Sequence, residues 1–110
     1  MVFIESEIFS KQIREILSDD ELAELQSALA ARPKMGDVIR GTGGLCKLRL
    51  PDRRRGQGKR GGARMLYLHL PDRAHIHLLL VYGKDQQADL TTAQKKQLRV
   101  LVERIKSTQK

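Results

Sequence analysis

The sequence predicts an α+β fold in which an antiparallel sheet carries helices on one of its faces. Apolar residues repeat at helical spacing in the first third of the chain, strand-length segments fill the middle, and a second helical stripe ends it. The 110 residues suit a single domain over 1–110. A content of 40% hydrophobic and 31% charged residues is typical of a globular protein.

The N-terminal third predicts an edge strand and a helical hairpin. Residues 2–4 form a short apolar segment, and the residues after it place four apolar side chains on one helical face: Phe9, Ile13, Ile16 and Leu17. Ser18 and Glu21 have the spacing of a capping box, which predicts that a second helix starts here. We expect that helix to end before Pro33.

Three strands are expected in the middle of the chain. The segment 45–50 alternates, with apolar residues on one side and Lys47 and Arg49 on the other. A glycine-rich loop over 36–44 precedes it, and a basic, glycine-rich loop over 51–62 follows it. The segments 63–70 and 75–82 predict a hairpin with its turn at 71–74.

Pairing Leu70 with His75 assigns the two faces of this hairpin. The nearly all-apolar face is assigned to the core, and its members are Ala63, Met65, Tyr67, Ile76, Leu78, Leu80 and Tyr82. The other face carries Arg64, His75 and His77 and is expected to stay open to solvent. A bulge or a slip of one residue would exchange the two faces.

The last helix is predicted from a second capping box, which runs from Thr91 to Gln94. Its core-facing stripe consists of Leu98, Leu101, Val102 and Ile105. The final few residues are expected to fray.

The excess positive charge is confined to one quarter of the sequence. The net charge is +8, and residues 40–64 contain nine Lys and Arg against one anion, Asp52. Such a concentration attracts a polyanion, of which RNA or DNA is the first candidate. A solvated basic loop is the alternative. A membrane partner is not expected, because the basic segment lacks an amphipathic helical pattern and the longest apolar stretch cannot span a bilayer.

Motifs for cofactors, metals and nucleophiles are weak. The segment around Gly58 and Lys59 lacks the first glycine and the Ser or Thr of a phosphate-binding P-loop. His69, His75 and His77 have no carboxylate or cysteine near them in sequence to complete a metal site. The single cysteine, Cys46, is interpreted as a small core residue; it excludes an internal disulfide and favours a reducing compartment.

After these exclusions, the remaining candidate for a functional site is a surface of the sheet on which positively charged side chains converge. Lys47, Arg49 and Arg64 are expected to project from neighbouring strands and to hold one phosphate together. Further phosphate contacts are expected from Arg40, Arg53, Arg54, Arg55, Lys59 and Arg60. Binding of RNA or DNA through backbone contacts, without chemistry, is the alternative.

RNA supplies its own nucleophile, the 2′-hydroxyl beside each phosphate. A protein that cleaves RNA need only orient this hydroxyl, move two protons and stabilise the charged phosphorane. Lys47 is the expected base, because the neighbouring arginines disfavour its protonated form. Arg64 is expected to bind the scissile phosphate.

Four segments, in this order and spacing, resemble the RelE-type toxins of bacterial toxin–antitoxin pairs, most closely the HigB branch. They are GDVIRGTGGL at 36–45, KLR at 47–49, GKRGGAR at 58–64 and YGK at 82–84, and the resemblance covers almost the whole chain. It implies a RelE/ParE-like fold and a metal-independent endoribonuclease that needs no cofactor and cuts mRNA, usually in the ribosomal A site. It also implies a cytoplasmic toxin, monomeric by itself, that a DNA-binding HigA-type antitoxin inhibits.

The resemblance matches the family's strand cations to Lys47 and Arg49 and its Gly-x-Arg arginine to Arg64. Two positions depart from RelE, since Asp85 and Thr91 stand where it has an arginine and a tyrosine. The expected substitutes for the general acid are Tyr82, Lys84 and Tyr67. His77 is a less favoured candidate for the same role. Two alternatives stay open: a ParE-like toxin that inhibits DNA gyrase without cutting RNA, and a ribosome- or RNA-binding module without chemistry.

Overall fold

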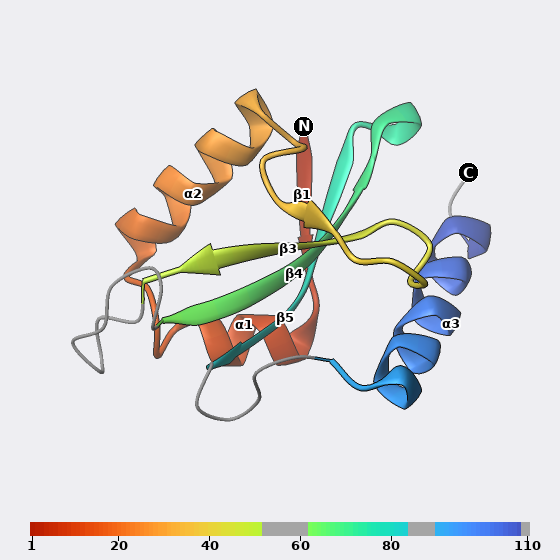
Figure 1. Cartoon of the computed structure of the whole chain (residues 1–110). Helices are drawn as coiled ribbons and strands as arrows, with labels where there is room; N and C mark the ends of the chain where they lie inside the picture. Colours follow the sequence, from red (N-terminus) through yellow and green to blue (C-terminus); the bar gives the residue numbers. More distant parts are fainter. Residues whose placement is uncertain (52–61, 84–89, 109–110) are drawn as a thin grey trace.

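The computed structural model describes residues 1–51, 62–83 and 90–108 (Figure 1). In this part of the chain five strands form one sheet in the order β1-β5-β4-β3-β2. The strands are β1 (Val2–Glu5), β2 (Asp37–Val38), β3 (Leu45–Leu50), β4 (Ala63–Leu70) and β5 (His75–Gly83). The helices are α1 (Glu7–Ile13), α2 (Asp19–Ala31) and α3 (Thr92–Thr108). The predicted α+β class is confirmed.

The sheet is mixed, so the expectation of an antiparallel sheet is wrong at one edge. The predicted edge strand at residues 2–4 is confirmed as β1, but it pairs with β5 in parallel. Parallel neighbours need a long connection, and most of the chain lies between these two strands. The two-residue β2 was not expected; it lies in the predicted loop and pairs Asp37 with Lys47.

Helices cover both faces of the sheet, and the prediction of one open face is wrong. Helices α1 and α2 lie on one face and α3 on the other (Figure 1). The reason lies in β4 and β5, which are buried along nearly their whole length, because strands that are apolar on both faces need cover on both. We call the two sides the α1/α2 face, which carries Cys46, Leu48, Met65, Tyr67 and Ile76, and the α3 face, which carries Leu45, Leu66, Leu68, Leu70 and Tyr82.

A β-bulge in β5 decides which face the end of this strand presents. The predicted pairing of the hairpin at its turn is confirmed, but the register shifts by one residue between Leu66 and Tyr67 and leaves Leu79 as the extra residue. Beyond the bulge, Leu80 and Tyr82 lie on the α3 face. The prediction that Leu80 and Tyr82 lie on the same face of the sheet as Tyr67 is therefore wrong.

Helix α1 fixes this bulge at the point where β1 ends. The backbone N–H of Ser6 donates to the carbonyl of Leu78 at 3.0 Å, and its hydroxyl donates to the carbonyl of Leu79 at 2.8 Å. Further along α1, the side-chain oxygen of Gln12 accepts the N–H of Val81 at 2.9 Å. The N-cap residue of α1 and one side chain within the helix thus satisfy backbone groups of β5 that β1 no longer reaches.

Both predicted capping boxes are confirmed. The Ser18 hydroxyl accepts the N–H of Glu21 at 3.1 Å, and the Glu21 carboxylate accepts the N–H of Ser18 at 2.9 Å. Thr91 and Gln94 make the same two bonds, at 3.1 and 2.9 Å, at the start of α3. Helix α2 ends before Pro33, as predicted.

Candidate active site

A row of three side chains crosses β3, β4 and β5 on the α3 face. Arg49 is paired with Arg64, and Arg64 with Tyr82. Residues paired across antiparallel strands project from the same face, with Cβ atoms about 4.5–5.5 Å apart. The row therefore brings together predicted catalytic residues from three strands.

Lys47 belongs to the same surface. It precedes Arg49 by two residues on β3, so it lies on the same face, about 7 Å along the strand. Lys47 is partly exposed and Arg49 is exposed. The sequence prediction that Lys47 and Arg49 face away from Cys46, Leu48 and Leu50 is confirmed.

Arg64 is buried, whereas the sequence predicts that it lies on a face open to solvent. Its exposed fraction is only 6%, and one of its guanidinium N–H groups donates to the carbonyl of Ala63 at 3.4 Å. The cause is its position, because β4 is the central strand of the sheet and has neighbours on both sides. Arg49, on β3, keeps its contact with solvent. The site thus combines one buried and two accessible cations.

Tyr82 is the general-acid candidate that the structure brings to this row. It is 7% exposed and lies directly opposite Arg64. Tyr67 lies on the α1/α2 face and is fully buried. Its hydroxyl donates to the carbonyl of Pro33 at 2.8 Å and accepts the N–H of Gly36 at 2.9 Å, and burial raises its pKa to about 12. Tyr67 therefore supports the fold and is removed from the candidates.

His77 lies on the α3 face but far along the sheet from the row. It pairs with Leu68, which is four residues, about 13 Å, from Arg64. Burial lowers the pKa of His77, with smaller contributions from His75 and Arg73. Within the described ranges, no three His, Cys, Asp or Glu side chains group as metal ligands.

Cys46 is a buried free cysteine on the α1/α2 face, as predicted. Burial raises the pKa of its thiol, and a thiol rather than a thiolate is a poor nucleophile. Cys46 therefore takes no part in the candidate site.

Of the remaining predicted phosphate ligands, the structure describes only Arg40. Arg40 is exposed in the turn between β2 and β3. The basic-loop residues and one strand-end residue lie outside the described residues: Arg53, Arg54, Arg55, Lys59, Arg60 and Lys84.

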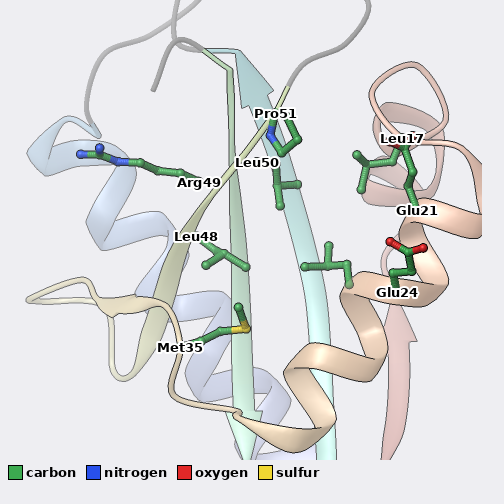
Figure 2. A pocket seen from close by; sticks show the side chains of 9 residues that line it. Leu17, Glu21, Glu24, Met35, Leu48, Arg49, Leu50 and Pro51 are labelled. Atoms are coloured by element: carbon green, nitrogen blue, oxygen red, sulfur yellow. The ribbon is translucent and has the colours of Figure 1, made fainter. Parts of the chain in front are cut away.

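A groove of about 270 Å³ lies between α2 and β3 (Figure 2). Its lining is mainly apolar but includes Glu21 and Glu24. In Figure 2 the Arg49 side chain extends away from both of these carboxylates. The positive charge of the candidate site therefore remains on the α3 face.

Two further residues beside Lys47 were not found from the sequence. Asp37 is the partner of Lys47 across β2 and β3, and Lys95 lies in the first turns of α3. Both line one recess of about 180 Å³ together with Lys47. Neither was predicted as a site residue, because only tertiary packing brings β2 and the start of α3 to β3.

No family model matches the chain. In the part of the chain that the structure describes, no helix has the length and apolar character of a membrane span.

Proposed function

We propose that this chain is a RelE-like toxin and acts as an endoribonuclease that cuts mRNA on its α3 face. One observation carries the proposal: Lys47, Arg49, Arg64 and Tyr82 share that face on three adjacent strands. Lys47 and Arg49, the two accessible cations of β3, suit a single phosphate, which a guanidinium can contact through two hydrogen bonds. The four sequence segments that resemble the HigB branch support the same activity.

The reaction uses the 2′-hydroxyl of the substrate as its nucleophile. Lys47 takes the proton of this hydroxyl, whose oxygen attacks the adjacent phosphorus. The bond from phosphorus to the 5′-oxygen breaks, and Tyr82 donates its proton to the leaving oxygen. The products are a 2′,3′-cyclic phosphate and a free 5′-hydroxyl, so atoms and charge balance.

The two arginines have different roles in this proposal. Arg49 is exposed, so it contacts the phosphate oxygens and stabilises the phosphorane. Arg64 is a positioning residue, because its buried charge lies directly opposite Arg49 and repels it toward solvent. We also propose that Arg53, Arg54 and Arg55, which follow β3 in the sequence, contact the RNA backbone.

The biological setting follows from the resemblance. The toxin is cytoplasmic, monomeric by itself and active on mRNA in the ribosomal A site, without a metal or cofactor. A DNA-binding antitoxin of the HigA type neutralises it.

The test uses purified protein, ribosomes and one defined mRNA. Primer extension is expected to map discrete cuts, and end analysis is expected to find 2′,3′-cyclic phosphates and 5′-hydroxyls. Lys47→Ala and Arg49→Ala should each reduce the cleavage rate by about 100-fold or more. Lys34→Ala and Arg32→Ala remove equal charges from exposed positions outside the site and should cut normally.

Induced expression separates the alternatives. Translation arrest with cut transcripts supports the ribonuclease. Filamentation with intact transcripts would instead support a gyrase-directed toxin. Ribosome association without growth arrest would support a binding module, and either result overturns the proposal.

A further inference from the structure

We propose that the recess beside Lys47 is a nucleotide subsite that selects guanine. This inference rests on the proposed function and extends it to base preference. Six residues from three parts of the chain line the recess: Asp37, Val38, Ile39, Lys47, Leu90 and Lys95. Its volume of about 180 Å³ is below the range of about 300–1,000 Å³ that is typical of drug-sized ligands, so a single base is the fitting occupant.

Two lysines enter this recess from different elements. Lys47 comes from β3 and Lys95 from α3. No ion pair of the Lys95 ammonium occurs within the described ranges. Two point charges in one recess attract a phosphate, and Lys47 also belongs to the cleavage row. The recess therefore receives the nucleotide next to the scissile phosphate.

The walls suit a base rather than a second phosphate. Ile39 and Leu90 are partly buried apolar side chains that pack against the α3-face core. They offer a surface on which the flat face of an unpaired base can lie, and single-stranded RNA exposes such faces.

Asp37 supplies the selective contact. It lies opposite Lys47, so its carboxylate is on the same side of the sheet. An ionised carboxylate only accepts hydrogen bonds. Guanine presents two adjacent donors on its pairing edge, whereas adenine, cytosine and uracil each place an acceptor beside their donor. A carboxylate can therefore hold guanine through two bonds and the other bases through one.

Binding of uncleavable RNA tests this subsite. The probes are 2′-O-methyl tetranucleotides with one variable base among uridines, which lack the attacking hydroxyl. The intact protein is expected to bind the guanine probe at least about fivefold more tightly than the others. Asp37→Asn should abolish the preference for guanine, because an amide places a donor beside its acceptor and no longer matches two adjacent donors. Asp72→Asn, an exposed acid in the turn after β4, should keep it.

The contribution of Lys95 to phosphate binding is tested in the same assay. Lys95→Ala should weaken all four probes about equally and lower the salt dependence by about one phosphate contact. Lys96→Ala removes the same charge from the next, exposed position and should leave binding unchanged. Equal affinities for all probes, or a guanine preference that survives Asp37→Asn, would overturn the subsite while cleavage stands.

A titration with 5′-GMP and 5′-AMP separates this inference from the proposed function. Shifts of the Ile39 and Leu90 methyl signals that favour GMP support the recess even if no RNA is cut. If RNA is cut but neither nucleotide moves these signals, the subsite is wrong and the ribonuclease is unaffected.

Discussion

Tyr82 lies directly opposite Arg64 across β4 and β5, on the same face of the sheet. Without the bulge at Leu79, the alternation of β5 would turn Tyr82 toward the α1/α2 face and away from Arg64. Two residues of the N-terminal segment hold the same bulge, since the Ser6 hydroxyl donates to the carbonyl of Leu79 and the Gln12 side-chain oxygen accepts the N–H of Val81. The candidate site therefore depends on an irregularity that the start of the chain stabilises.

Tyr82→Phe should separate chemistry from binding. The change removes the proposed proton donor and keeps the ring beside Arg64, so the cleavage rate should fall by about 100-fold or more while binding of the uncleavable tetranucleotides stays the same. Single-turnover kinetics measure the rate, and fluorescence anisotropy measures the affinity. A variant that cuts as fast as the parent would exclude Tyr82 as the general acid.

Tyr67→Phe should have the opposite effect. Tyr67 is fully buried and its hydroxyl is bonded to Pro33 and Gly36, so its removal leaves the partly buried Gly36 N–H and Pro33 carbonyl without this partner. The free energy of unfolding should fall by about 1–3 kcal/mol, as measured by urea denaturation. Cleavage at a temperature well below the melting point should be unchanged. A stable but inactive Tyr67→Phe protein would return Tyr67 to the catalytic candidates.

Arg49→Gln should lower activity without lowering stability. Like charges placed directly opposite on a sheet repel, so removing the exposed member of the Arg49–Arg64 pair should raise the free energy of unfolding by up to about 1 kcal/mol. Arg99→Gln is the matched control, because Arg99 forms an exposed ion pair with Glu103 at 3.1 Å and its loss should cost about 0.3–0.5 kcal/mol. Thermal denaturation of both variants checks the sign. A marked destabilisation by Arg49→Gln would show that its charge is structural.

Acid should destabilise the protein through His77. The folded pKa of this side chain lies below its ordinary value of 6.5, mainly because the ring is buried. The unfolded chain therefore binds a proton more readily, so the stabilisation is complete above about pH 6.5 and falls as the pH drops toward the folded pKa. Among the described residues, four other titratable or charged groups surround this ring. His75 and Arg73 lie near it, and Glu5 and Glu7 line the cavity that His77 also lines.

His77→Phe tests this pH dependence. Nε2 of His77 is buried, and no hydrogen-bond partner for it occurs in the described part of the chain. An apolar ring should therefore raise the free energy of unfolding at pH 7 by about 1 kcal/mol and flatten its change between pH 5 and pH 7. His69→Gln, on the same hairpin but only partly buried, should keep the slope of the parent. An unchanged slope in His77→Phe would assign the acid sensitivity to another group.

Much of the fold was predictable because its signals are local. The capping boxes at Ser18 and Thr91 place a hydroxyl and a carboxyl or amide three residues apart, so neither needs the rest of the protein. The alternation of residues 45–50 similarly predicted that Lys47 and Arg49 share a face. Two strands, β4 and β5, are apolar on both sides, which should have indicated helices on both faces rather than one.

The sequence by itself determined the helices, the strands other than β2, the caps of α2 and α3, the concentration of positive charge and the shared face of Lys47 and Arg49. Tertiary structure alone decided that Tyr82 joins Arg64, that Arg64 is buried, and that Asp37 and Lys95 meet at one recess. The physical reason is sequence distance. The bonds that fix the bulge join residues 73 and 69 positions apart, and the burial of Arg64 depends on strands that pair with β4 from both sides. Local periodicity carries no information about contacts over such separations.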